Sequence, residues 1–415
     1  MEKFHNFFKN KYRPILLFNI CLGLVLRLYQ LGKQSLWFDE AYSVLMSKNL
    51  TGLWFDQIRD ASPPLYYTLL HYWMGWFGKD EFSLRFLSVL FGILLIPLIY
   101  AVGTTLFDKR VGFYASLLTA ISPIHIYYSQ EIKMYSLLPL LSLASFFMLY
   151  LCLKEKKNLF WVLYGLTTIL MLYAHNYGIF LLIAEFCFYV LYTPEQKDAF
   201  LKFAPLKNSS LMGFVLAQTV ILLAYLPRLL VISGQAAMDI NPWIQVPTLS
   251  DVASTFMHFS LLSWRLTLTK FLSTTLNSSL PLFALIFLIG ICSREKNKLF
   301  LQTYLLLPLG LAFCVSYKIP VYVAGRYDMI VFPAFCLILA VGLNKIKMPL
   351  LRSLFLIVIL LSTSISLYHY YFVYNKSNDR LLARLKKDFK KSDSVEFSPG
   401  DNLNQVHSAY IFKKS

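Results

Sequence analysis

The chain has 415 residues, of which 57% are hydrophobic and 15% are charged, and its mean hydropathy is +0.56. Soluble proteins carry about 25% charged residues, so this composition excludes an ordinary soluble enzyme and indicates an all-α integral membrane protein. The net charge of +17 does not indicate a nucleic-acid-binding protein, because the basic residues form short clusters between apolar segments.

Eleven apolar segments fit membrane-spanning helices. In chain order they cover residues 14–31, 84–106, 111–124, 135–153, 159–173, 177–192, 210–231, 275–292, 299–317, 327–343 and 349–372. One further segment, residues 63–78, opens with two prolines and contains His71 and two tryptophans. We expect it to be a partial or interfacial helix and the whole chain to be a polytopic helical bundle.

The positions of lysine and arginine support this count, because cytoplasmic loops are enriched in both. With residues 63–78 left outside the membrane, the short basic loops all fall on the side of the basic N-terminus. We therefore expect a cytoplasmic N-terminus and a long first extracytoplasmic loop, about residues 32–83, that contains interfacial helices. The membrane domain would cover residues 1–372, and the tail, residues 373–415, would be extracytoplasmic although its basic charge opposes that side.

Ionisable residues from four segments meet at the extracytoplasmic side of this topology. They are Asp39 and Glu40 in the first loop, Glu131 and Lys133 in the second, His175 in a sharp turn, and Arg326 at the start of the tenth span. A carboxylate can accept a proton from a hydroxyl group, and arginine and lysine bind phosphate. Such a set suits the transfer of a sugar from a polyprenyl phosphate to a hydroxyl group.

Several motifs follow one another in a recognisable order. They are Arg27-Leu-Tyr-Gln-Leu, Leu36-Trp-Phe-Asp-Glu-Ala-Tyr-Ser, Ser62-Pro-Pro-Leu-Tyr-Tyr, Glu81-Phe-Ser-Leu-Arg85, Tyr128-Ser-Gln-Glu-Ile-Lys-Met-Tyr135 and Gly325-Arg-Tyr. In this order they resemble the bacterial members of glycosyltransferase family 39, which are related to protein O-mannosyltransferases and to the aminoarabinose transferase of lipid A. The resemblance covers residues 1–190 and 320–335 and implies the GT-C fold.

The resemblance also implies roles for the individual residues. Asp39 corresponds to the catalytic base and Glu131 to the acid of the second loop, while Glu40 would orient the acceptor or a neighbouring cation. Lys133 and Arg326 would bind the phosphate. Tyr135, His175 and Tyr327 complete the predicted substrate-binding set.

The same resemblance implies an inverting glycosyltransferase in the bacterial inner membrane, with an extracytoplasmic active site. Its donor would be a polyprenyl-phosphate sugar and its acceptor a glycan, a lipid or a protein. We expect no required metal or other cofactor, since the second loop contains no Asp-x-Asp motif. Two other functions stay open: a transporter or flippase of lipid-linked sugars, and a polymerase or ligase of surface polysaccharide.

Each residue also has a structural interpretation. Asp39 could cap a helix that begins near Glu40, and Glu131 and Lys133 could form an ordinary surface pair. Arg326 could extend to lipid headgroups, and we expect Arg27, near the outer end of the first span, to do so. The residues that fit either a sugar site or an interfacial aromatic belt are Tyr66, Tyr67, Tyr127 and Tyr128.

Overall fold

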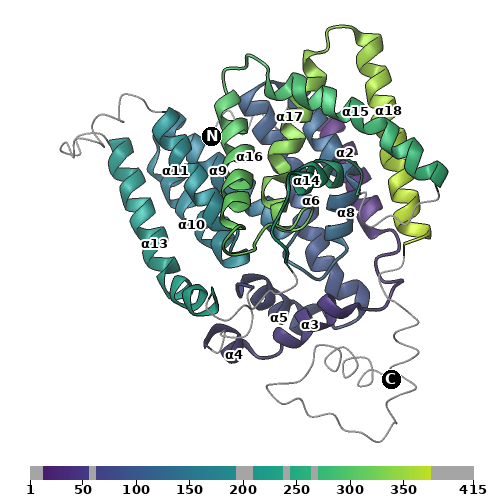
Figure 1. The fold of residues 1–415 in the computed structure, drawn as a ribbon. Helices are drawn as coiled ribbons and strands as arrows, with labels where there is room; N and C mark the ends of the chain where they lie inside the picture. The colour runs from purple at the N-terminus through teal and green to yellow at the C-terminus, as the bar shows by residue number, and fades with distance from the viewer. Residues whose placement is uncertain (1–12, 56–61, 193–208, 237–243, 263–269, 375–415) are drawn as a thin grey trace, which may run out of the picture.

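The computed structural model describes residues 13–55, 62–192, 209–236, 244–262 and 270–374, and these residues form helices without any β-strand (Figure 1). The basic tail beyond residue 374 lies outside the described residues. The longer helices are α2 (Arg13–Leu28), α6 (Glu81–Leu106), α7 (Lys109–Ile121), α9 (Leu137–Glu155), α10 (Asn158–Ala174), α11 (Gly178–Tyr192), α13 (Ser209–Ala236), α15 (Lys270–Ile291), α16 (Lys298–Val315), α17 (Phe332–Lys345) and α18 (Pro349–Phe372).

Each of the eleven predicted apolar segments overlaps one of these helices, with bounds that differ by a few residues. Six helical stretches in the described residues are long and apolar enough to cross a membrane, and four further apolar helices are shorter. The segment 111–124 differs from expectation, since α7 has 13 residues and ends at Ile121 before a new helix, α8 (Pro123–Ser129). The chain is a multi-pass membrane protein, and the count of eleven spans stays a prediction.

The bundle has an inner and an outer set of helices. The stretch Tyr327–Lys345, which contains α17, is 89% buried over its most apolar window, and α9 is 78% buried. By contrast, the corresponding windows of α13 and α18 are 22% and 28% buried, so these helices present most of their apolar surface outward. Such exposed apolar surface is what a lipid-facing helix requires.

Three short helices gather at one end of the bundle: α3 (Phe38–Met46), α4 (Leu50–Phe55) and α5 (Leu65–Phe77) (Figure 1). Helix α5 has 13 residues, whereas a spanning helix needs about 20. It exposes three aromatic side chains, those of Tyr72, Trp76 and Phe77. A short helix with exposed aromatic residues is typical of the membrane interface, as the sequence predicted.

The expectation that Arg27 extends to lipid headgroups is wrong. Its side chain is fully buried and joins α2 to α7 and α8. The guanidinium donates to the carbonyl oxygens of Thr119 (3.0 Å) and Ala120 (2.9 Å), to Ser129 Oγ (3.1 Å), and lies 2.7 Å from His125 Nδ1. Sequence gives the position of a charge along a helix, but the rotation of α2 in the bundle decides which way it points.

Replacing Arg27 by methionine should therefore destabilise the bundle. Carbonyl groups at the end of α7 would lose a buried donor, at about 1–3 kcal/mol for each unsatisfied group. Thermal unfolding in detergent measures the effect, with the exposed Arg110→Met as the matched control. Equal melting temperatures for the two variants would contradict a stabilising role of Arg27 between α2, α7 and α8.

Candidate functional site

The first loop and the start of the tenth apolar segment meet through an ion pair. Asp39 Oδ2 lies 2.5 Å from Arg326 Nη2, although 287 residues separate the two in the chain. Their side chains are 19% and 20% exposed, so the pair is partly accessible rather than sealed in the core. The exposed part of the pair is open to an incoming anion.

The local structure explains why Asp39 faces Arg326. Helix α3 begins at Phe38 with Trp37 as its N-cap residue, and the carboxylate of Glu40 accepts the Trp37 backbone N–H at 3.3 Å. Asp39 thus lies in the first helical turn and does not cap the helix, so the capping interpretation is wrong. Adjacent residues of a helix point about 100° apart, which separates the directions of Asp39 and Glu40.

Glu40 forms a second and fully buried ion pair with Arg85 of α6. The Arg85 Nε donates to Oε1 at 2.9 Å and Nη2 donates to Oε2 at 2.7 Å, while the side chains are 2% (Arg85) and 0% (Glu40) exposed. The other N–H groups of Arg85 donate to the carbonyl oxygens of Leu31, Gln34 and Ser35. All five guanidinium donors of Arg85 are engaged, and this pair fixes the first loop on α6.

Glu40 also reaches the second loop, because its Oε1 accepts the Ile132 backbone N–H at 3.3 Å. The acids of the two loops, Asp39 and Glu131, therefore belong to adjoining segments. Glu131 and Lys133 are 1% and 6% exposed, so the interpretation as a surface pair is wrong. The Lys133 ammonium packs over the rings of Tyr42 (5.5 Å) and Tyr67 (5.7 Å).

Aromatic residues connect Arg326 to the turn between α10 and α11. Arg326 Nε donates to Tyr135 OH at 2.7 Å, and its guanidinium lies 5.2 Å from the centre of that ring. The Tyr135 and Tyr327 rings stack with their centres 6.3 Å apart, and the centre of the His175 ring lies 4.8 Å from that of the Tyr327 ring. The aromatic-belt interpretation is wrong for Tyr66, Tyr67, Tyr127 and Tyr128, which are all buried.

Burial and neighbouring charges shift the pKa values of Arg326 and His175. Burial alone would lower the pKa of Arg326, but interaction with Tyr135, Asp39, Tyr327 and Glu131 outweighs it and holds the pKa well above its usual value. Burial, and then the cations Arg326, Lys133 and Arg228, lower the pKa of His175 to about 3. His175 is neutral at physiological pH, and because its Nδ1 accepts the Tyr177 N–H at 3.1 Å, its Nε2 carries the proton.

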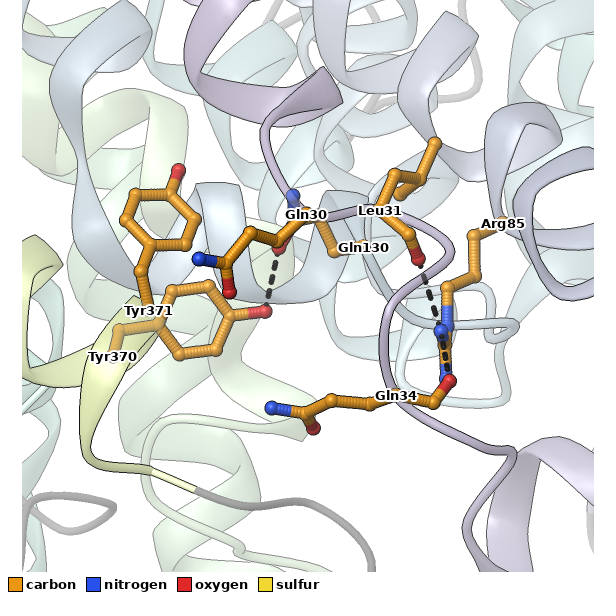
Figure 2. A pocket seen from close by; sticks show the side chains of 7 residues that line it. All are labelled: Gln30, Leu31, Gln34, Arg85, Gln130, Tyr370 and Tyr371. Carbon is orange, nitrogen blue, oxygen red and sulfur yellow. Dashed lines mark hydrogen bonds between the residues drawn. The ribbon is translucent and has the colours of Figure 1, made fainter.

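A polar pocket lies behind the Glu40–Arg85 pair. Figure 2 shows Arg85 directed at the carbonyl oxygens of Leu31 and Gln34. On the other side of the pocket, the Tyr370 hydroxyl of α18 donates to Gln130 Oε1, with 2.8 Å between the two oxygens. The side-chain amide nitrogen of Gln130 also donates to the backbone carbonyl oxygens of Arg27 and Tyr29. The Arg85 guanidinium and the Gln130 side chain already form hydrogen bonds within the protein. This pocket therefore links α18 to the first loop and is not the candidate active site.

All eight sequence-predicted residues thus lie in one connected region, formed by α3, the second loop, the α10–α11 turn and the start of η3 (Tyr327–Val331). Sequence reasoning did not assign the partners that hold them. Arg85 was visible in the Glu81–Arg85 motif, but nothing in the sequence pairs it with Glu40.

The described residues contain no group of three or more His, Cys, Asp or Glu side chains placed to hold a metal ion. The site therefore offers no evident ligand set for a divalent cation, and the expected independence from metals stays a prediction.

Residues 61–223 match the family model of dolichyl-phosphate-mannose-protein mannosyltransferases. No curated protein sequence matches the chain.

The fold is similar to solved membrane enzymes. The apo oligosaccharyltransferase of Archaeoglobus fulgidus aligns with a TM-score of 0.60 and 13% identity, over 97% of this chain and 64% of its own. The same organism's AglB, in complex with an inhibitory peptide and a dolichol-phosphate, gives 0.56 and 14%, over 91% and 58%. ArnT of Cupriavidus metallidurans bound to undecaprenyl phosphate gives 0.52 and 15%, over 81% and 61%. The chain thus spans less than two thirds of the length of these proteins.

The buried ion pair predicts a strong and specific coupling. Glu40→Gln leaves the Arg85 charge unpaired in the core and should reduce the free energy of unfolding by about 3–5 kcal/mol. In an Arg85→Met background the same substitution should be much less destabilising, because no buried charge is left behind. Chemical or thermal unfolding of the four proteins measures the coupling, and equal effects of Glu40→Gln in both backgrounds would exclude it.

The lowered pKa of His175 predicts how stability depends on pH. The unfolded chain binds a proton at this residue near pH 6.5, whereas the folded chain does so only near pH 3. Stability should therefore fall with decreasing pH below about 6.5, by up to about 1.4 kcal/mol per pH unit from this group. Comparing the melting temperatures of the wild type and His175→Asn at pH 7.5 and 5 tests this: the wild type should lose more than the variant, and parallel losses would refute it.

Proposed function

We propose that this multi-pass membrane protein with the GT-C fold is a glycosyltransferase that uses a polyprenyl-phosphate sugar. The observation that carries the proposal is the ion pair between Asp39 and Arg326, which brings a base and a phosphate-binding group into one partly accessible cluster. The family matched by residues 61–223 is described by a dolichyl-phosphate-linked donor, and two structurally similar proteins hold a polyprenyl phosphate.

Arg326 and Lys133 bind the donor phosphate in this proposal. The guanidinium can engage two phosphate oxygens, and Lys133 adds a second positive charge from the facing loop. When the phosphate binds the Arg326 guanidinium, the Asp39 carboxylate is released from its ion pair with that residue. Donor binding therefore frees the base, and the acceptor reacts second.

Asp39 then takes the proton of the acceptor hydroxyl. The hydroxyl oxygen forms a bond with the anomeric carbon while the bond from that carbon to the phosphate oxygen breaks, and the bonding electrons leave with the phosphate. Attack from the face opposite the phosphate inverts the anomeric configuration. The products are the glycosylated acceptor, a protonated Asp39 and a polyprenyl phosphate that stays paired with Arg326.

The remaining residues support these two groups. Glu131 lies close enough to Arg326 to raise the pKa of the guanidinium, and it remains the second predicted catalytic acid. Tyr135 orients the guanidinium, while Tyr327 and His175 provide a ring face and a neutral N–H donor for the sugar. Glu40 pairs with Arg85, which fits the second of its two predicted roles, the orientation of a neighbouring cation, and in this proposal it acts as a positioning residue.

The reaction takes place on the extracytoplasmic side of the bacterial inner membrane in this proposal. The positions of lysine and arginine in the chain support that side, and the acceptor is a glycan, a lipid or a protein exposed there.

A flippase or transporter of lipid-linked sugars is the main alternative. Transporters place ionisable groups near the middle of the membrane, whereas Asp39, His175 and Arg326 lie at helix ends or in turns. Glu185, within α11, accepts hydrogen bonds from Ser145 (2.6 Å) and Tyr164 (3.1 Å), which fits a packing role. A polysaccharide polymerase or ligase would be distinguished by an acceptor that is itself a lipid-linked glycan.

Treatment with EDTA tests the expected independence from metals. Purified protein should retain its transferase activity after chelation, because phosphate charge is balanced by Arg326 and Lys133 in the proposal. Loss of activity on chelation and recovery on adding a divalent cation would contradict it.

Asp39→Asn should abolish sugar transfer, by about a hundredfold or more, since the amide cannot accept the proton. The variant should still bind undecaprenyl phosphate, at least as tightly as the wild type, because Arg326 no longer has to leave a carboxylate. Release of polyprenyl phosphate measures transfer, and Asp108→Asn, an N-cap substitution before α7 that keeps a capping side chain, is the control. Near-normal transfer by Asp39→Asn would remove this residue from the mechanism.

A further inference from the structure

The backbone of Gly325, directly before Arg326, is held on both sides. Its N–H donates to Asp328 Oδ2 at 2.9 Å, and its carbonyl oxygen accepts the Tyr128 hydroxyl at 2.5 Å. Its φ is +70°, and a Cβ atom there would lie 2.6 Å from His258 Cδ2. Only glycine combines this conformation with so close an approach, so the turn that presents Arg326 is fixed against its neighbours.

The neighbour on one side is helix α14 (Leu249–Leu261). Its Thr255 hydroxyl donates to Asp328 Oδ2 at 2.5 Å, the same oxygen that accepts the Gly325 N–H. Tyr322 OH lies 2.7 Å from Thr255 Oγ1. Thr255 and Asp328 are 3% and 0% exposed, so these hydrogen bonds form out of water, where they are strongest.

Other contacts hold α14 in place without this hydroxyl. Phe256 and Phe259 pack edge-on against Phe335 of α17 at 5.6 and 5.4 Å, and Ser366 of α18 donates to the Leu261 carbonyl at 3.0 Å. The Thr255–Asp328 bond is thus not needed to dock the helix. Its specific effect is on the turn that carries Arg326.

We propose that Thr255 and Asp328 are positioning residues that set where the Arg326 guanidinium meets the donor phosphate. The inference rests on the proposed function, and it connects α14 to the phosphate through a short chain of contacts. A displacement of α14 moves Asp328, Asp328 moves the Gly325 N–H, and the guanidinium that pairs with Asp39 follows. Helix α14 thereby adjusts donor binding.

Binding of undecaprenyl phosphate to the purified full chain tests this proposal. Thr255→Val keeps the shape but removes the hydroxyl, and it should weaken binding by about tenfold, as expected for the loss of one buried hydrogen bond. Thr255→Ser restores the hydroxyl and should bind like the wild type. Thr303→Val removes a buried hydroxyl bonded to its own helix, α16, and serves as the matched control. Melting temperatures show whether each variant is folded, and Thr255→Ala replaces Thr255→Val if the latter does not fold.

A double-mutant cycle with Arg326→Gln separates the two levels of the proposal. Arg326→Gln should itself weaken binding strongly, and Thr255→Val should then add no further loss, because it acts through the guanidinium. Normal binding by Arg326→Gln would overturn the proposed function. Weak binding by Arg326→Gln together with normal binding by Thr255→Val, or with additive losses in the double variant, would overturn the positioning role alone.

Discussion

The buried ion pair between Glu40 and Arg85 is the interaction on which the geometry of the site depends. Removing two charges from water is unfavourable, and the free energy is recovered only when every donor and acceptor finds a partner. Here Arg85 uses its five N–H groups on Glu40 and three backbone carbonyls, while Glu40 additionally accepts the Ile132 N–H. One pair therefore joins α6 and the two loops that carry the predicted acids.

The neighbouring pair of Asp39 and Arg326 differs in a way that matters for chemistry. It is about one-fifth exposed, and the ring of Tyr135, which stacks with Tyr327, lies against the Arg326 guanidinium. A rigid, sealed pair next to an accessible one gives a site whose framework is fixed while one charged contact can be exchanged. In the proposed reaction the donor phosphate displaces the Asp39 carboxylate from Arg326. The first loop, which carries Asp39, stays in place during this exchange because the Glu40–Arg85 pair holds it.

Much of this arrangement could be predicted from the sequence, and the failures have identifiable causes. Composition and hydropathy predicted a helical membrane bundle, and each of the eleven predicted apolar segments overlaps a helix. The charge rule and the family motifs assigned Asp39, Glu131, Lys133 and Arg326 to one region. The pattern could not separate Asp39 from Glu40, because the rotation of α3 sends one toward Arg326 and the other toward Arg85. It also could not tell whether Arg27 faces lipid or protein, or that α14 docks on the Arg326 turn, since both depend on packing between segments far apart in the chain.

The most direct test of this account is a structure of the full chain in lipid nanodiscs with undecaprenyl phosphate bound. The account predicts phosphate oxygens within hydrogen-bonding distance of the Arg326 guanidinium, with the Asp39 carboxylate displaced and facing open space beside the lipid headgroup. A phosphate bound elsewhere, with Asp39 and Arg326 still paired, would contradict it.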